Sequence, residues 1–333
     1  MTKMKKLLAI GLAGVLAVGF AACSKGGDNA QVPTPADSAD VAAAKTGYAV
    51  YSEIKNNDNG DSETSLEIDS LCAAVLVNSE GKLIDVKIDE AQTKPDLAVD
   101  NGDVADLRTK FEKQGDYGMA EASPIGKEWF EQVDAFEQWA IGKTVEEIKA
   151  GVDETGYPTD ADLKAGCTIN SAGFTSVVTK AMENATECGA KETDTLSLSI
   201  TTEKNYESNE TNLQYDSDYA IVTLDADGKV TSCIIDASQA KCTIADGKFT
   251  VEKGAYPTKK ELKGDYGMAA ASPIGKEWFE QAEAFEGWCI GKTAKEIKAC
   301  VGEDMKSNDA DLSAGCTITI ASIADNTAKA ATV

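Results

Sequence analysis

The sequence GDYGMAEASPIGKEWFEQ at 115–132 returns almost unchanged as GDYGMAAASPIGKEWFEQ at 264–281. The match extends without a gap from Gly115–Thr168 to Gly264–Thr317, where about 39 of 54 positions are identical. Two copies at so long a period indicate a duplicated domain rather than a solenoid of short repeats.

Upstream of this segment the copies diverge, but a weaker correspondence remains. Val75–Lys94 resembles Val222–Lys241, with the register changed by two residues. We therefore expect two tandem domains, at 47–189 and 190–333, each of the size of a small globular domain.

Each copy reads as strands followed by helices, which predicts an α+β fold with helices packed on a small antiparallel sheet. In copy one, strands are expected at Tyr48–Ile54 and Leu71–Val77, and a hairpin turn at Asn78–Lys82 leads to a third strand, Leu83–Asp89. The alternation along the third strand predicts two faces, one with Ile84, Val86 and Ile88 and the other with Asp85, Lys87 and Asp89.

The helices of each copy have recognisable start signals. Ser123-Pro124 predicts a helix start, because Ser caps and Pro suits the first helical position. Thr144 to Glu147 forms a capping box. The spacing predicts one buried helix face made of Trp129, Val133, Phe136 and Ala140, and last helices at Phe174–Ala185 and Ile323–Ala331.

The composition excludes several kinds of chemistry. The chain has 333 residues, a net charge of −24 and no His, so it has no Ser-His-Asp triad, His base, His metal ligand or Cys-x-x-Cys-His haem attachment. The acidity argues against a nucleic-acid partner, and Arg108 is the single Arg available for a phosphate clamp.

The N-terminus has the features of an export signal. Basic residues precede an apolar stretch that is too short to span a bilayer comfortably, and Cys23 follows small residues. We predict that 1–22 is a lipoprotein signal peptide and that Cys23 is lipidated. The alternative is an ordinary cleaved signal with a chance Cys. The segment 23–46 is expected to be the lipidated Cys and a flexible tether.

Eight Cys remain after Cys23, and no Cys-x-x-Cys spacing is among them, so no metal site is expected. Cys167 and Cys316 occur in both copies and are expected to be free. Six others occur in one copy only, which suggests the disulfide pairs Cys72–Cys188, Cys233–Cys242 and Cys289–Cys300. The alternative is that all eight are buried thiols.

The segment that carries chemistry is DLKAGCT at 162–168, repeated as DLSAGCT at 311–317. It resembles the flavinylation motif D-x-x-S/T-G-A-T/S of FMN-binding domains, a family with a member in the sodium-pumping NADH:quinone reductase. Two such domains behind a lipobox are most similar to the flavin lipoprotein of Gram-positive extracellular electron transfer. The departures from the motif are Ala165, Ala314, Cys167 and Cys316.

The resemblance implies that an exported flavin transferase takes FMN from FAD and esterifies its phosphate to Thr168 and Thr317, giving two covalent FMN groups. The positions that match the motif are further candidates for cofactor binding: Asp162, Gly166, Cys167, Asp311, Gly315 and Cys316.

Physical reasoning gives these residues roles. Gly166 would allow close backbone approach or a positive φ, and a helix that begins just after Thr168 would direct amide groups at the phosphate. Asp162 would orient the acceptor hydroxyl or a metal used by the transferase. The plain alternative is a Gly turn before a helix, with Thr as an ordinary cap.

Other residues near the motif are weaker candidates. Lys127 and Lys276 would neutralise the phosphate or the flavin N1, with a solvated Lys as the alternative. Some aromatic residues on the first long helix of each copy are candidates for stacking on the flavin, although their helical spacing favours core packing. They are Trp129, Phe130, Phe136 and Trp139 in copy one and Trp278, Phe279, Phe285 and Trp288 in copy two.

These features predict a lipid-anchored, extracytoplasmic electron carrier rather than an enzyme, with reductase activity toward extracellular acceptors as an alternative. The expected partners are the flavin transferase, a membrane quinol or NADH dehydrogenase as electron donor, extracellular electron acceptors, and the membrane through the lipid alone. The main rival is a lipoprotein that binds a flavin or other small ligand non-covalently. A structural or adhesive surface protein is a third possibility.

Overall fold

The computed structural model describes residues 41–57 and 63–332. The predicted signal peptide, Cys23 and most of the predicted tether lie outside these residues. The predicted tether extends too far along the chain, because strand β1 already begins at Ala43, and Thr46 is buried. Small residues such as Ala43 and Ala44 look like linker composition, but Ala43 pairs with Lys191 of the neighbouring strand and Ala44 is buried.

Copy one begins with an antiparallel sheet. The strand order is β3-β2-β1-β4, and a short strand from copy two, β9, also pairs with β1. The bounds are β1 (Ala43–Asn56), β2 (Leu66–Val77), β3 (Leu83–Thr93), β4 (Thr186–Lys191) and β9 (Gly254–Tyr256). The expected boundary between the copies, at 189/190, therefore falls inside β4.

The hairpin turn at Asn78–Lys82 is confirmed, since the Asn78 amide donates to the Lys82 carbonyl at 3.0 Å. The predicted faces of β3 are wrong at one position. Val77 pairs with Leu83 and Leu76 with Asp85, so Ile84 is the extra residue of a bulge. Leu83 thereby joins Val86 in the helix-facing core, while Ile84 packs on the opposite side.

Copy two repeats this sheet with four strands in the order β5-β6-β7-β8. Their bounds are β5 (Thr195–Lys204), β6 (Asn212–Leu224), β7 (Val230–Ala245) and β8 (Lys248–Phe249).

The helices of each copy follow its strands. Copy one has α1 (Leu97–Asp100), α2 (Lys110–Lys113), the 3-10 helix η1 (Gln114–Tyr117), α3 (Trp129–Ala140), α4 (Val145–Lys149), α5 (Ala161–Gly166) and α6 (Ala172–Glu183). Copy two has α7 (Lys259–Leu262), the 3-10 helix η2 (Lys263–Tyr266), α8 (Trp278–Cys289), α9 (Ala294–Ala299), α10 (Ala310–Gly315) and α11 (Ala321–Ala330).

The predicted capping box at Thr144 is confirmed, and α6 and α11 lie within two residues of their predicted positions. The helix start at Ser123-Pro124 is wrong, because α3 begins at Trp129, with Glu128 as its N-cap. Ser123 instead closes a loop, and its hydroxyl accepts from the Lys127 amide at 3.4 Å.

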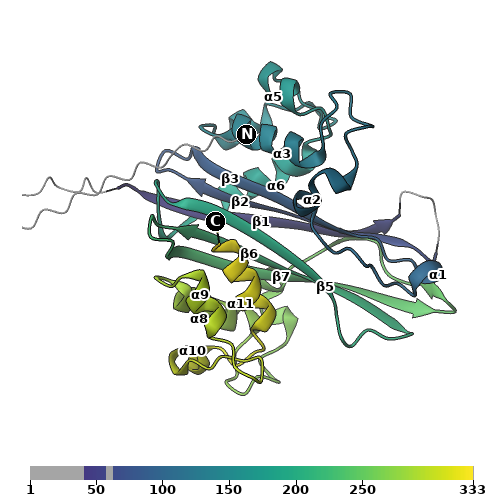
Figure 1. Ribbon diagram of the computed structural model, residues 1–333, viewed down its shortest axis with the longest axis vertical. Helices are drawn as coiled ribbons and strands as arrows, with labels where there is room; N and C mark the ends of the chain where they lie inside the picture. The colour runs from purple at the N-terminus through teal and green to yellow at the C-terminus, as the bar shows by residue number, and fades with distance from the viewer. Residues whose placement is uncertain (1–40, 58–62, 333) are drawn as a thin grey trace, which may run out of the picture. The chain divides into compact units, whose positions relative to one another are not determined.

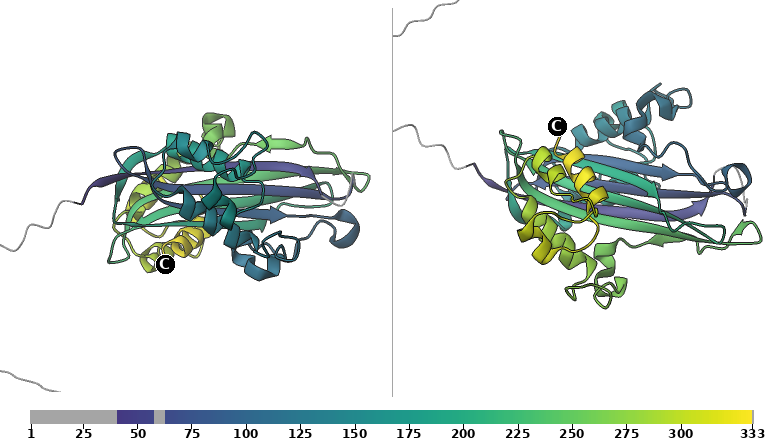
Figure 2. Two further views of the ribbon diagram at one scale, coloured as in Figure 1. Left: turned by 90° about the horizontal axis from the view of Figure 1, so that it is seen from above. Right: turned by 60° about the horizontal axis from the view of Figure 1, so that its bottom comes forward.

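The two sheets face each other, and helices cover both outer faces. Figure 1 shows α3, α5 and α6 on the sheet of copy one and α8 to α11 on the sheet of copy two, and the further views agree (Figure 2). Three layers of apolar side chains lie between these elements: one under each set of helices and one between the sheets. The predicted α+β class is confirmed.

Polar contacts also join the two sheets. The Tyr48 hydroxyl donates to the Asp236 carboxylate at 2.8 Å, and the Tyr219 hydroxyl lies 3.3 Å from Ser52 Oγ. Within residues 41–57 and 63–332, no helix is both long enough and apolar enough to cross a membrane.

The proposed disulfides are not formed, and the eight Cys at 72–316 are free thiols. Cys72 and Cys188 lie on β2 and β4, with β1 between them. Cys233 and Cys242 are nine residues apart on β7 and therefore face opposite sides of the sheet. Cys289 instead lies against Cys233, and Cys300 lies near Cys316.

The burial of these thiols predicts their reactivity. Of the eight thiols at 72–316, Cys188 is half-buried and the other seven are buried, so one of these eight is expected to react quickly with a thiol reagent in the native protein. The rest are expected to react on unfolding. Counting modified thiols by mass before and after denaturation checks this, and Cys188→Ser is expected to remove the fast reaction. Several fast thiols in the native protein would contradict the packing.

The long helix of each copy is fastened to its sheet by a buried Glu. The Ile88 amide donates to Glu137 Oε1 at 2.6 Å, and the Ile235 amide donates to Glu286 Oε1 at 2.7 Å. Burial raises the pKa of both carboxyls, that of Glu137 to about 8, and Glu286 differs in that the paired Lys260 opposes the rise.

This difference predicts a pH effect on stability. Between its ordinary pKa of 4.5 and about 8, Glu137 is protonated when folded and ionised when unfolded, so it makes stability fall as pH rises. Glu137→Gln keeps the acceptor but does not titrate, so the variant is expected to lose less stability than wild type from pH 5 to pH 8. Urea unfolding at both pH values checks this.

The matched variant in copy two is Glu286→Gln. It leaves Lys260 without its charged partner, so stability is expected to fall at pH 8. If stability depended on pH in the same way in wild type and Glu137→Gln, Glu137 would not be the group responsible for the pH effect.

Candidate functional site

The candidate motif of copy one forms the short helix α5 and the residues just after it. Asp160 caps this helix, and its carboxylate accepts from the amides of Asp162 and Leu163 at 2.9 and 3.2 Å. Asp162 itself lies exposed in the first turn. In copy two, Asp309 caps α10 and Asp311 is exposed in the same way. Sequence reasoning singled out Asp162 and Asp311 and missed the capping residues.

Gly166 allows α5 to approach α3 closely. A Cβ at Gly166 would lie 2.5 Å from the Cβ of Ala135, and one at Gly315 would lie 2.8 Å from the Cβ of Ala284. Of the two roles considered for this glycine, close approach is therefore the one the structure uses, since Gly166 and Gly315 are not among the residues with positive φ.

Cys167 and Cys316 point inward from the motif. Both are buried in the helix-facing cores, and their amides close α5 and α10 by donating to Leu163 and Leu312 at 2.8 Å. Burial raises the pKa of both thiols. The two residues thus fill core space beneath the motif as small apolar groups.

Thr168 is half-buried and is held by a residue that sequence reasoning missed. Gln132 Oε1 accepts from the Thr168 amide at 2.8 Å, from the Thr168 hydroxyl at 3.3 Å and from the Ile169 amide at 3.3 Å. Gln281 accepts from the Thr317 amide and hydroxyl at 2.8 and 3.2 Å. The available signal was a polar residue, identical in both copies, on the buried face of the long helix.

A helix follows each acceptor, as predicted. α6 begins four residues after Thr168, and α11 four residues after Thr317. The N-cap residues of these helices, Ser171 and Ile320, make no side-chain capping hydrogen bond.

Lys127 lies beside the motif of copy one. Its Nζ is 3.9 Å from the position of a Cβ on Gly166, and its charge lowers the pKa of Cys167 against the larger opposing effect of burial. The amine is thus placed to face an anionic group attached at this end of α5.

The aromatic rings at the start of the long helices are core residues. Trp129 packs edge-on against Phe174 at 5.9 Å, and the Lys110 amine lies over the Trp129 ring at 5.6 Å. In copy two, Lys259 lies over Trp278 at 5.1 Å. The faces of both indole rings are therefore in contact with other side chains, in agreement with the core packing that the helical spacing of these residues favoured.

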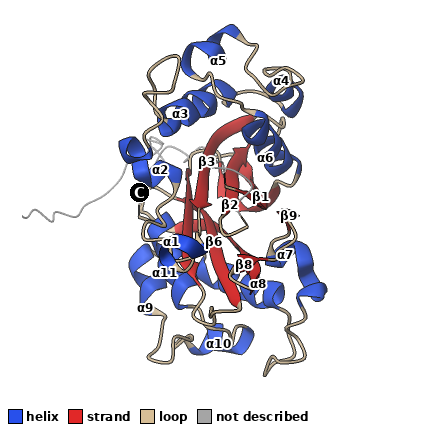
Figure 3. Ribbon diagram, turned by 90° about the vertical axis from the view of Figure 1, so that its right-hand side faces the viewer, coloured by secondary structure: helices blue, strands red, loops and turns tan. Residues whose placement is uncertain are grey.

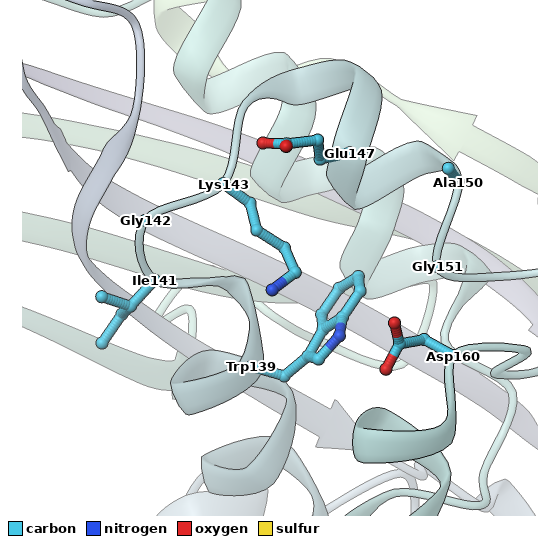
Figure 4. Close-up of a pocket in the computed structure, with 8 residues that line it drawn as sticks. All are labelled: Trp139, Ile141, Gly142, Lys143, Glu147, Ala150, Gly151 and Asp160. Atoms are coloured by element: carbon cyan, nitrogen blue, oxygen red, sulfur yellow. The ribbon is translucent and has the colours of Figure 1, made fainter.

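Trp139 instead borders an open pocket of about 440 Å³ that adjoins the start of α5. Figure 4 shows Lys143 and Asp160 on either side of the indole. The Lys143 amine is 4.8 Å from the ring centre. The pKa of Asp160 is held low by the Leu163 amide above all, and also by the Trp139 indole. An aromatic ring and a cation therefore lie together next to the motif.

The pocket residues differ between the copies. Cys300 stands in copy two at the position of Gly151, where a Cβ would lie 2.1 Å from the Trp139 ring. Trp288 accordingly packs on Phe285 at an interplanar angle of 33°, against 52° for Trp139 on Phe136. The acceptor geometry is shared by the two copies, while the nearby ring is placed differently.

The fold and site together define a duplicated α+β protein in which a buried Gln amide holds one Thr in each copy. Among the residues that the structure describes, no group of three or more Cys, Asp or Glu side chains is placed to hold a metal ion. The residues at each motif fit a phosphate carried on the Thr oxygen, since each Thr is half-buried and, in copy one, the Lys127 amine lies beside Gly166 of the motif.

No family model and no solved structure matches the chain. The chain is similar to a protein named chlorophenol reductase from Desulfitobacterium hafniense, with 29% identity over 127 residues. The similarity covers 30% of this chain and 39% of that protein, so the chain spans about two fifths of the relative's length. It is a weak and partial homology.

Proposed function

We propose that this chain is a lipid-anchored, extracytoplasmic electron carrier with two covalent FMN groups, joined through phosphoesters to Thr168 and Thr317. The observation that carries the proposal is the repeated acceptor site: each copy holds one half-buried Thr with the same buried Gln amide. The name of the chlorophenol reductase describes a redox protein, which supports a redox role here.

In this proposal, the residues of each motif hold the phosphate end of the cofactor. Thr168 Oγ1 supplies the ester oxygen, and the Lys127 amine opposes the phosphate charge. The first turn of α6, which begins four residues later, adds the positive end of a helix dipole. Asp162, exposed on α5, would face the transferase that loads the site. When bound, FMN supplies the electron uptake and release.

The two sites would be reached from opposite sides of the protein. α5 and α10 lie on opposite outer sides of the paired sheets in two perpendicular views (Figures 1 and 3). We propose that one side accepts electrons from a membrane quinol or NADH dehydrogenase, and that flavins on either side deliver them to extracellular acceptors. The lipid on Cys23 would keep the carrier at the outer face of the membrane.

The test is a co-expression experiment with the flavin transferase encoded by the same organism. The intact mass is expected to increase by two FMN groups, and the band is expected to fluoresce as a flavin after denaturing electrophoresis. Chains made without the transferase are the control and should carry no adduct. Yellow colour that is lost on denaturation would favour non-covalent binding, and a chain without flavin would favour a structural role.

A further inference from the structure

The buried amide behind each acceptor has a role that the motif itself does not supply. Resting on the function proposed above, we propose that Gln132 and Gln281 are positioning residues that make Thr168 and Thr317 competent to accept the FMN phosphate.

The first reason is that both ends of the Gln132 side-chain amide are hydrogen-bonded. Its side chain is 0% exposed. Oε1 accepts the three hydrogen bonds from Thr168 and Ile169, while Nε2 donates to Ser123 Oγ at 3.1 Å and to the Lys127 carbonyl at 3.2 Å. A side-chain amide with hydrogen bonds to both its oxygen and its nitrogen cannot rotate without breaking those hydrogen bonds. It therefore fixes the backbone at Thr168.

The second reason is the direction of the hydroxyl. Thr168 Oγ1 donates its hydrogen toward the buried amide. The lone pairs of that oxygen are therefore turned away from Gln132. In the transfer, the new bond joins Oγ1 to phosphorus, the pyrophosphate bridge of FAD breaks, and AMP leaves while the Thr proton passes to a base of the transferase. The hydrogen bonds from the Thr168 and Ile169 backbone amides to Gln132 do not involve that proton, so they can persist during the transfer.

The third reason is that copy two repeats four of the five hydrogen bonds that Gln132 makes. Gln281 Nε2 donates to Ser272 Oγ at 3.2 Å and to the Lys276 carbonyl at 3.1 Å, and its Oε1 holds Thr317. Nearby positions differ between the copies, such as Lys164 and Ser313, or Gly151 and Cys300. This also accounts for the repeated Ser-Pro-Ile-Gly-Lys loop, because its Ser hydroxyl and Lys carbonyl accept the two hydrogen bonds of the Gln amide in each copy.

The experiment uses the second copy as an internal control. The full chain is co-expressed with its transferase, and tryptic peptides 165–180 and 307–329 report the adduct at Thr168 and at Thr317 separately. Gln132→Ala is expected to slow flavin incorporation at Thr168 by on the order of tenfold or more, because three donors lose their acceptor. Thr317 should be loaded as in wild type. Gln281→Ala should give the reverse pattern.

Gln132→Glu separates positioning from a merely structural role. A protonated Glu both donates and accepts, whereas the carboxylate cannot donate to the Lys127 carbonyl. The ratio of the Thr168 adduct to the Thr317 adduct is therefore expected to be near that of wild type at low pH and to fall as this buried carboxyl ionises. Taking the ratio within one chain cancels the pH dependence of the transferase.

The outcomes are distinct. Two adducts in wild type with an undiminished Thr168 adduct in Gln132→Ala would overturn this inference alone. A pH-independent ratio in Gln132→Glu would also overturn it. A wild-type chain with neither adduct would overturn the proposed function together with the inference that rests on it.

Discussion

Thr168→Ala is expected to remove one of the two FMN groups completely and leave the other in place. The variant lacks the oxygen that would form the phosphoester, and no other hydroxyl in the described part of the chain has the same hydrogen bond to Gln132 Oε1. The intact mass should fall by one FMN relative to wild type, and flavin fluorescence after denaturation should fall by about half. Thr317→Ala should do the same through copy two, and the double variant should carry no flavin.

Thr168→Ser is the matched control. It retains a hydroxyl at the same backbone position, so flavin should still be incorporated. Stability should change little in Thr168→Ala, since one half-buried hydrogen bond to a neutral group contributes about 1 kcal/mol. A Thr168→Ala chain that retains both adducts would show that another residue, such as Ser171, is the attachment point.

Gly166→Ala has the largest expected effect on the site without removing the acceptor. The new Cβ would lie 2.5 Å from the Cβ of Ala135, so α5 and α3 must move apart. Such overpacking costs about 1–3 kcal/mol. The displacement also pulls Thr168 from Gln132, which sits on α3. Lower stability in urea and slower flavin incorporation at Thr168 are therefore expected together.

A compensating variant tests the geometry directly. Ala135→Gly removes the methyl group that Gly166→Ala would strike, and by itself costs about 1 kcal/mol within a helix. The double variant should be more stable than the two separate losses predict, and it should recover flavin incorporation. Gly315→Ala should be milder, because its Cβ would lie 2.8 Å from Ala284. Strictly additive losses of stability would contradict this packing.

The sequence alone determined the local elements. Gly81 has a positive φ in the predicted hairpin turn, Thr144 forms its capping box, and the apolar spacing from Trp129 to Ala140 gives one buried helix face. These features depend on residues a few positions apart, so they can be read from short windows. The α+β class follows in the same way from strands succeeded by helices in each copy.

The sequence-based predictions were wrong where the local structure depends on contacts between residues far apart in the chain. Ser123-Pro124 has the composition of a helix start, but the Ser hydroxyl is taken up by the loop and by Gln132. The bulge at Ile84 puts this side chain on the opposite face of β3 from Val86. Comparing the copies suggested disulfides, but the sheet places β1 between Cys72 and Cys188.

The sequence by itself determined that one long segment occurs twice in this protein and which part of each copy carries the candidate acceptor. Only the tertiary structure decided what holds that acceptor. Gln132 lies 36 residues before Thr168, and nothing in their spacing joins them. They meet because Gly166 lets α5 close onto α3, where burial requires each polar group to find a partner.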